Sequence, residues 1–450
     1  MKNVLQPIKT VAAICGKQKS FESEARLTHH CVCVQCDDGR LLYHALTGEL
    51  ILLEHGDTLE NQREELIRRR FLVPAAFDEI KYADQVLKTI SLAFPVPRKV
   101  TGCMIFTTTD CNARCFYCYE LGRKRENMSD QTAHDVAEYI AKLDRTEEIN
   151  ITWFGGEPLF NSRVIDLVTA DLREKGIRFY SQMISNGYLF DEEIVERARK
   201  DWNLRYVQIA LDGTEEIYNR SKAYIYREGS AYQRVMRNIG LLLEAGVHVS
   251  IRLNTDARNA LDLMELSKEL KKRYGHYDNI HVYAALIHDF GGVKHNFKSK
   301  EEELRRYKEL KDCLKREGLY KARTLRRTVA MTSCMADDPG RITFLPAGHI
   351  ARCEHESDRD FVGSIYSEEK DEALIAAWKE KLKSADCGDC PIYPRCVLLK
   401  KCAWYADGCT DVDRAIMRMN MEEQIINSYK STINRETISE GEEFPSDDLC

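Results

Sequence analysis

The chain has 450 residues, which is enough for two or three domains and a sizeable hydrophobic core. Hydrophobic residues make up 44% of it and charged residues 31%, the ordinary balance of a water-soluble protein. The net charge is −6, but residues 431–450 hold six acidic residues and one arginine and contribute −5 of it, so the rest is nearly neutral and no general nucleic-acid binder is expected.

Membrane association is not expected either. No apolar run approaches membrane-spanning length, and the N-terminus lacks the apolar segment of a signal peptide. We therefore expect a cytoplasmic protein with no membrane partner. In that compartment, seventeen cysteines indicate metal or redox chemistry rather than disulfides. The acidic C-terminal tail is predicted to be disordered.

Residues 1–98 are predicted to form a small separate domain. Alternating strand patterns flank the turn pair Asp38-Gly39. The expected elements are strands at 28–35, 41–46 and 49–54 and helices at 58–70 and 77–92. An exposed edge strand of such a ribbon can take up an extended peptide by strand addition. The alternative is a structural cap on the next domain.

Three cysteines of this region, Cys31, Cys33 and Cys36, suggest a further metal site. Cys31 and Cys33 would share one face of a strand, however, and free cysteine is a common buried apolar residue. We therefore do not expect metal there.

From about residue 99 the pattern changes to strands alternating with helices. The predicted strands are 103–108, 149–154, 178–185, 205–211, 247–254 and 279–287, with amphipathic stretches such as 130–143, 191–200 and 231–245 between them. Six such units predict an α/β fold, a parallel sheet curved into a partial (β/α)6 barrel of the TIM type. Active sites of such barrels lie at the carboxyl ends of the strands.

A cysteine motif follows the first of these strands. Cys111, Cys115 and Cys118 have the spacing C-x3-C-x2-C, with Tyr117 before the third. A [4Fe–4S] cube has four irons, so three thiolates leave one iron open for another ligand. The alternatives are a zinc knuckle, although structural zinc sites prefer paired C-x2-C units and four protein ligands, or buried thiols that happen to be close.

The motif resembles that of the radical S-adenosylmethionine (SAM) superfamily, whose members chelate SAM at the open iron. The resemblance implies that Cys111, Cys115 and Cys118 hold the catalytic cluster and that Tyr117 is the family's aromatic residue beside the cofactor.

Two more motifs fall at equivalent strand ends. Gly155-Gly156-Glu157-Pro158 follows the second strand, and Ser185-Asn186 ends the third. The glycines let the backbone approach a ligand closely, and Glu157 can accept from an ammonium. The resemblance implies that the first motif, Pro158 included, binds SAM's amino group and that the second binds its ribose. Alone, the first motif would more often be an ordinary turn.

The fourth and fifth strands depart from the family pattern. Ala210 stands where many relatives carry a hydroxyl residue, and Lys222 stands where many carry an arginine for SAM's carboxylate. Lysine supplies the charge without the bidentate fork. Arg252 shares one face of the fifth strand with Ser250 and Asn254, and an inward arginine needs an anionic partner, so it is a second candidate for SAM. The alternative is an arginine at the barrel rim.

Cysteines return after a charged, helical bridge. Seven of them resemble the SPASM extension of radical SAM enzymes, which holds two auxiliary [4Fe–4S] clusters: Cys334, Cys353, Cys387, Cys390, Cys396, Cys402 and Cys409. The family's interleaved pattern implies that four close the outer cluster (Cys387, Cys390, Cys396, Cys409) and that three remain for the inner one (Cys334, Cys353, Cys402). Cys313 is the nearest spare thiol. Two zinc sites are the alternative.

The expected organisation has five parts: a winged-helix-like leader-peptide recognition domain at 1–98, a radical SAM partial barrel at 99–310, a bridge at 311–330, a C-terminal Fe–S cluster (SPASM) domain at 331–415, and a C-terminal helix with an acidic tail at 416–450.

The resemblance implies three [4Fe–4S] clusters, SAM, and an external one-electron reductant such as flavodoxin or ferredoxin. It implies a maturase that installs a crosslink, above all a cysteine thioether, in a ribosomally made precursor peptide. The inner cluster's open iron would bind the substrate thiolate. The alternatives are a formylglycine-forming anaerobic sulfatase-maturating enzyme, a peptide cyclase that forms carbon–carbon crosslinks, and a non-catalytic Fe–S carrier.

Overall fold

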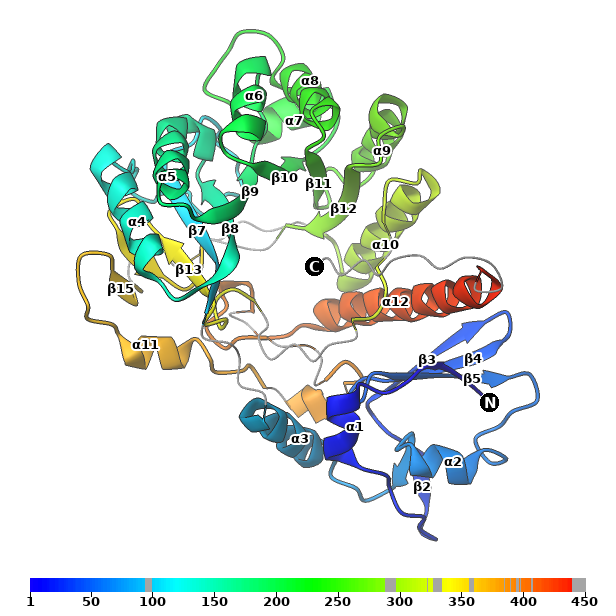
Figure 1. Cartoon of the computed structure of the whole chain (residues 1–450). Helices are drawn as coiled ribbons and strands as arrows, with labels where there is room; N and C mark the ends of the chain where they lie inside the picture. The colour runs from blue at the N-terminus through cyan, green and yellow to red at the C-terminus, as the bar shows by residue number, and fades with distance from the viewer. Residues whose placement is uncertain are drawn as a thin grey trace.

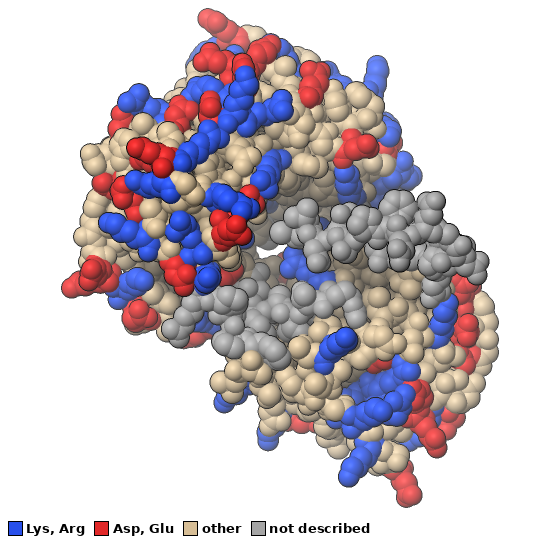
Figure 2. Space-filling view, in the orientation of Figure 1, with Lys and Arg blue, Asp and Glu red and all other residues tan. Residues whose placement is uncertain are grey.

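A computed structural model describes residues 1–93, 99–287, 297–321, 323–326, 334–355, 360–383, 385–388, 390–393, 396, 398–405 and 408–438. It has two lobes (Figure 1). The larger lobe is built on the central sheet, the smaller one is N-terminal, and the C-terminal cysteine-rich segment lies between them. Lysines and arginines are interspersed with acidic residues over the face shown in Figure 2.

The larger lobe contains the predicted partial barrel. Six parallel strands follow the order β12-β11-β10-β9-β8-β7, and the sheet does not close. Their bounds are β7 Val100–Thr108, β8 Arg145–Gly155, β9 Arg178–Ser185, β10 Leu204–Leu211, β11 His248–Thr255 and β12 Ile280–Leu286. All six predicted strands are confirmed, with ends that move by at most four residues.

Helices cover the outer face of this sheet, as in other α/β barrels. They are α4 Asp130–Lys142, α5 Ser162–Glu174, α6 Glu192–Lys200, α7 Glu215–Lys222, α8 Ala231–Glu244, α9 Asp262–Tyr274 and α10 Lys300–Arg316, with the 3-10 turn η1 at Pro158–Asn161. Several begin at a side-chain cap: Ser129 accepts from the Thr132 N–H and Asp191 from the Ile194 N–H.

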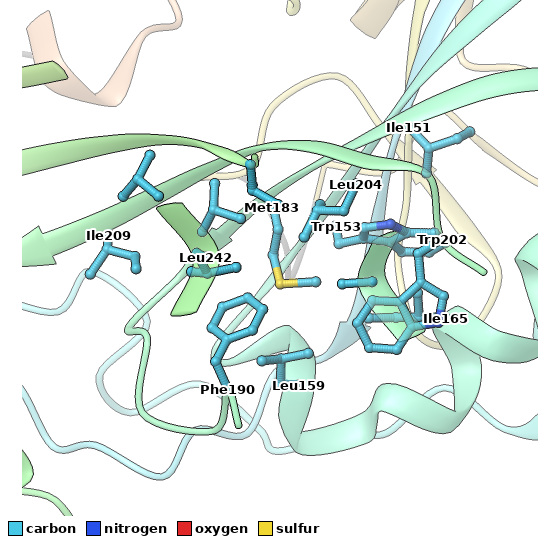
Figure 3. Close-up of a cluster of buried hydrophobic side chains, with 14 of the residues drawn as sticks. Ile151, Trp153, Leu159, Ile165, Met183, Phe190, Trp202, Leu204, Ile209 and Leu242 are labelled. Atoms are coloured by element: carbon cyan, nitrogen blue, oxygen red, sulfur yellow. The ribbon is translucent and has the colours of Figure 1, made fainter. Parts of the chain in front are cut away.

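Successive side chains along the barrel strands point alternately to the hydrophobic core under the helices and to the barrel interior. Ile151 and Trp153 on β8 point to the helical side, where they pack with Met183 and Phe190 in one buried cluster (Figure 3). The residues between them, such as Thr152, face inward. The carboxyl ends of the strands, where functional residues are expected, therefore carry a separate set of side chains.

The C-terminal segment extends the barrel sheet, which the sequence did not predict. β13 (Arg341–Phe344) pairs in parallel with β7, and β14 (His349–Ala351) and β15 (Gly363–Ser364) follow in antiparallel order. The sheet thus has nine strands. The rest of the segment contains α11 Glu372–Ala377 and the 3-10 turns η2 Ala385–Gly388 and η3 Ala403–Tyr405.

The N-terminal lobe contains the predicted three-stranded ribbon and one further strand. Its sheet has the order β1-β5-β4-β3, with β1 Lys2–Leu5, β3 Cys31–Cys36, β4 Gly39–His44 and β5 Glu49–Glu54. A second, two-stranded sheet joins β2 (Ala25–Leu27) to β6 (Leu72–Pro74). The helices are α1 Lys9–Cys15, α2 Arg63–Arg68 and α3 Glu79–Ala93.

The helix predicted at 58–70 is shorter than expected. Thr58 and Asn61 exchange hydrogen bonds between side chain and backbone, which closes a local turn and delays the helix start to Arg63. On β3, Cys31 and Cys33 do share one face, with their Sγ atoms 3.8 Å apart.

The long helix α12 (Asp411–Ile438) joins the two lobes. Its Ile425 packs with Leu41 of the N-terminal sheet, and its Glu423 pairs with Lys311 of α10. Helix α10 continues to Arg316, so the first residues of the expected bridge at 311–330 are helical. The tail predicted to be disordered begins at residue 431, but α12 continues to Ile438, so that prediction is wrong for 431–438, and 439–450 lie outside the described residues. Among the described residues, every helix is too short or too polar to cross a lipid bilayer.

Candidate active site

The cysteine motif lies in the loop that leaves the carboxyl end of β7. Cys111, Cys115 and Cys118 are all half-buried there. Burial, the Glu157 carboxylate and the two other thiols raise the pKa of Cys111 to about 12. The three thiols are thus close enough for their charges to repel one another. Bound iron would offset that repulsion, so this donor set fits a cluster.

A buried polar network holds this loop from below. The Tyr117 hydroxyl donates to the carboxylate of Asp212 over 2.8 Å, and the Lys222 ammonium donates to the Tyr117 oxygen over 2.7 Å. Lys222 also pairs with Asp212 over 3.3 Å, and both side chains are almost fully buried. Asn254 donates to the Tyr117 oxygen and to Asp212. Asp212, which the sequence did not single out, contacts all three of these side chains.

This network changes the expectation for Lys222. The residue was a candidate for SAM's carboxylate, but its charge is already paired with Asp212 and directed at the ring that precedes Cys118. Its main-chain oxygen also accepts from the N–H of Arg114, inside the motif. Lys222 is therefore placed to position the cysteine loop.

The two glycines bring a second loop against the first. The Gly156 N–H donates to the Thr108 carbonyl over 3.1 Å, and the Glu157 N–H donates to the Asp110 carbonyl over 3.0 Å. A Cβ atom on Gly155 would lie 2.0 Å from the Thr108 oxygen, and one on Gly156 would lie 2.3 Å from the Asp110 oxygen. No other residue type fits, since both contacts are to backbone.

Glu157 is fully buried and accepts several hydrogen bonds. Its carboxylate accepts from the Ser185 hydroxyl over 2.9 Å, the Asn186 N–H over 2.8 Å and the Leu159 N–H over 3.1 Å. Burial nevertheless raises its pKa to about 7. Ser185, expected at the ribose, holds Glu157 here, while the Asn186 amide donates to Asn112 next to Cys111 over 2.6 Å.

Arg252 faces the barrel interior, as its alternation predicted. Its guanidinium carbon lies 5.5 Å from the centre of the Trp404 ring, in the cysteine-rich segment. Its Nε is buried without a hydrogen-bond partner among the described residues. A buried donor of this kind is suited to an anionic ligand, so Arg252 remains a candidate contact for SAM's carboxylate or for substrate.

The C-terminal cysteines fall into two groups. Cys387, Cys390, Cys396 and Cys409 line one pocket, and burial together with the other three thiols raises the pKa of Cys396 to about 12. Their number and proximity fit a cluster with four cysteine ligands. We call these four residues the outer group.

The inner group is Cys334, Cys353 and Cys402. Burial raises the pKa of Cys353, with smaller contributions from Glu354 and from the other two thiols of the group. Cys313 is not near them: it is buried in α10, and its Sγ lies 3.9 Å from the Met264 carbonyl of α9. It cannot supply the eighth ligand without a large rearrangement.

The inner group lies beside the first cysteine loop. The ring of His355, two residues after Cys353, lies 4.1 Å from that of Tyr119, the residue after Cys118. Arg123 donates to the backbone carbonyls of Glu354 and His355. On the other side, the Trp404 indole N–H donates to His355 over 2.5 Å. The two sites are thus joined by packed side chains.

The outer group lies against the N-terminal lobe. Ile8, Val11 and Val86 of that lobe share a buried cluster with Cys390. The His30 ring hydrogen-bonds the Tyr393 carbonyl over 2.7 Å, and the Tyr393 hydroxyl donates to Asp84 of α3. In the part of the chain that is described, no three His, Cys, Asp or Glu side chains converge closely enough to chelate a single metal ion.

Comparison with known proteins identifies the barrel. Residues 105–256 match the family model of the Radical SAM superfamily. The radical SAM cyclopropyl synthase TigE of Paramaledivibacter caminithermalis is 21% identical over 204 residues, 41% of this chain and 42% of TigE. A probable GTP 3′,8-cyclase of Archaeoglobus fulgidus is 29% identical over 152 residues, 33% of this chain and 47% of that protein. The chain thus spans less than half the length of either relative.

Solved structures share the fold. Native anSMEcpe with bound AdoMet superposes with a TM-score of 0.56 at 14% identity, over 75% of this chain and 99% of that chain. Streptococcus suis SuiB bound to its precursor peptide SuiA superposes with a TM-score of 0.51 at 12% identity, over 89% of this chain and 98% of that chain. At such identities the likeness is one of fold: an open, mostly parallel barrel sheet.

Proposed function

We propose, from the radical SAM domain that residues 105–256 form, that this enzyme installs a cysteine thioether in a ribosomally made precursor peptide. One observation carries the proposal. The inner cysteine group is packed against the loop of the first three cysteines through Tyr119 and His355. A second redox site next to the radical-generating site is what a reaction needs when it must both start and finish a one-electron process.

The chain's own residues bind and position the cofactors. Cys111, Cys115 and Cys118 would hold the SAM-binding cluster, and the glycine loop with Glu157 would receive SAM's ammonium. When bound, the clusters and SAM supply the electron for SAM cleavage, the 5′-deoxyadenosyl radical, and an auxiliary acceptor for the electron left at the end. Arg252 and the buried Tyr117 network orient the ligand and exclude water from it.

The reaction balances without an added oxidant. The target carbon loses a hydrogen atom to the 5′-deoxyadenosyl radical, which becomes 5′-deoxyadenosine, and the cysteine thiol loses a proton to solvent. A carbon–sulfur bond forms, and an auxiliary cluster held by the C-terminal cysteines would accept the one electron left over. The peptide therefore loses two hydrogens for each thioether, while one SAM gives one methionine and one 5′-deoxyadenosine.

The N-terminal lobe is proposed to dock the leader of the peptide. Its strand β3 is the last strand of the four-stranded sheet, where an extended peptide can add as a further strand. The pairing of α1 and α3 with the outer cysteine group ties this lobe to the cluster region. SuiB, whose structure with a precursor peptide has a similar fold, aligns over 89% of this chain.

Formylglycine formation is the second candidate, since anSMEcpe has a similar fold. That structure aligns over 75% of this chain, less than SuiB does, and an enzyme that oxidises one residue has no need of an added docking lobe. TigE is named as a cyclopropyl synthase, so carbon–carbon bond formation is also tested below.

The experiment uses the anaerobic, iron-loaded enzyme with SAM, dithionite and the product of a short cysteine-bearing reading frame beside its gene. A thioether makes the peptide lose two hydrogens and makes its cysteine resistant to iodoacetamide. Loss of two hydrogens with the cysteine still alkylated indicates a carbon–carbon bond, and conversion of the cysteine to an aldehyde indicates formylglycine. Either result contradicts the proposal.

Docking is tested by amide hydrogen exchange. The precursor peptide should slow exchange in β3 (Cys31–Cys36), and a peptide without its leader should not. Exchange in β1, at the opposite edge of the same sheet, is the internal control. Equal protection with and without the leader would make the lobe structural. This test is preferable to deleting residues 1–98, because the deletion would expose Cys390 and its apolar neighbours.

A further inference from the structure

The inner cysteine group is one ligand short. A [4Fe–4S] cluster bound only by protein needs four ligands, and four of the C-terminal cysteines already share the outer pocket. If a cluster binds Cys334, Cys353 and Cys402, one of its irons would therefore have no thiolate. The spare cysteine of the region, Cys313, is buried between α10 and α9.

The carboxylate of Glu354 lies beside the inner group. Glu354 directly follows Cys353, and its Oε2 lies 3.7 Å from the Cys353 sulfur. The Arg352 guanidinium donates to the Ala336 and Met335 carbonyls, and the Trp404 indole donates to His355. The segments that carry Cys334 and Cys402 therefore both lie beside the Cys353–Glu354 pair.

The surroundings of Glu354 favour a cation. Its side chain is only 27% exposed, and its described charged neighbour is His355, whose Nε2 lies 3.9 Å from Oε1. Within the described residues, no lysine or arginine forms an ion pair with it. A largely buried carboxylate is costly without a positive partner, and iron would supply one.

The neighbouring histidine is already engaged. The Nε2 atom of His355 accepts from the Trp404 indole over 2.5 Å, and its ring packs on Tyr119. Arg123 binds the backbone carbonyls on both sides of this peptide unit, which fixes the segment relative to the first cysteine loop. Glu354 is therefore held in position while its carboxylate has no other strong partner in the described structure.

We propose that Glu354 is the fourth protein ligand of the inner auxiliary cluster, binding the iron that Cys334, Cys353 and Cys402 leave open. Carboxylate oxygen is a harder and more readily exchanged donor to iron than thiolate. The inner cluster would then differ from the outer one in having a single replaceable ligand. This inference rests on the proposed function only in assuming that the inner cysteines hold iron and sulfur.

The test uses the full chain in which Cys111, Cys115 and Cys118 are all replaced by alanine, so that only auxiliary clusters contribute to the spectra. In this background, Glu354→Ala should make one of the two clusters lose an iron on brief oxidation and give a [3Fe–4S] electron paramagnetic resonance signal. Glu354→Cys should suppress that signal and shift the reduction potential of the same cluster downward. Glu368→Ala, at an exposed position of the same segment, is the matched control and should match its parent.

Identical signals from Glu354→Ala and its parent, at equal iron content, would overturn the proposal. Should the alanine variant fail to fold, Glu354→Cys decides: unchanged potentials and spectra for both clusters would also overturn it. None of these measurements needs peptide or SAM. Failure of the ligand proposal therefore leaves thioether formation to its own assay, and failure of that assay leaves the ligand result standing.

Discussion

The two cysteine regions of this molecule are supported in different ways. The first loop is held by residues of four strand ends: Asp110, Glu157, Asn186 and Asp212 all bond to it or to its immediate neighbours. The C-terminal cysteines sit in a segment whose described regular structure is one helix, short strands, two 3-10 turns and a bridge between Lys381 and Leu399. The first site is thus held by the protein's own hydrogen bonds, whereas we expect the second to depend on bound metal for much of its stability.

The largest expected effect comes from removing the first site. Replacing Cys111, Cys115 and Cys118 by alanine should remove about four irons per chain, one cluster's worth, and abolish 5′-deoxyadenosine formation. The barrel should stay folded, because its core lies on the other face of the sheet. Iron analysis and chromatography of the nucleoside measure both effects.

The control for this variant is Cys103→Ala. Cys103 is a buried cysteine of β7 that packs on the helical side. Its replacement should leave iron content and SAM cleavage as in the native enzyme. SAM cleavage that survives in the triple variant would show that the first cluster is elsewhere.

Iron removal should make the C-terminal cysteine region sensitive to protease while the barrel stays resistant. After anaerobic chelation, we expect limited proteolysis to cut first between Leu382 and Thr410, while β7 to β12 resist. The segment loses its cluster cores, and thiolates left close together repel. Mass spectrometry of the fragments locates the cuts. The triple alanine variant with its auxiliary clusters intact should resist cleavage there; if it is cut as readily as the iron-free protein, the comparison fails.

Breaking the buried ion pair of Lys222 and Asp212 should give the next largest effect, a loss of folding stability. Lys222→Met leaves the Asp212 carboxylate buried without its partner, which costs about 3–5 kcal/mol of stability. Lys222→Met combined with Asp212→Leu should cost less, because no charge is left behind. Chemical denaturation measures both. Lys200→Met, which breaks an exposed pair with Glu196, should cost at most about 1 kcal/mol.

The barrel could be predicted well because the sequence patterns that indicate it are local. Strand alternation and the spacing of Cys111, Cys115 and Cys118 are both patterns within a few residues. The sequence did not predict that β13 pairs with β7, since that contact joins residues more than two hundred positions apart. Nor did it predict that Lys222 pairs with Asp212, because that contact forms only when the strand ends are brought together.

The smallest effect is a pH dependence at Glu157. Burial raises the pKa of this carboxyl from its usual 4.5 to about 7, so between those values the folded protein holds a proton that the unfolded chain has released. Stability should therefore fall as pH rises from 4.5 to 7, by at most about 3 kcal/mol from this group, and should level off above pH 7.

The test compares the native protein with Glu157→Gln, whose side chain cannot ionise. From pH 4.5 to 7, the unfolding free energy of the native protein should therefore fall relative to that of this variant. Glu174→Gln, at an exposed position on α5, should show no such trend. A native-minus-Glu157→Gln difference that stays constant from pH 4.5 to 7 would mean that Glu157 is ionised throughout, as it would be if a bound cation already faced it.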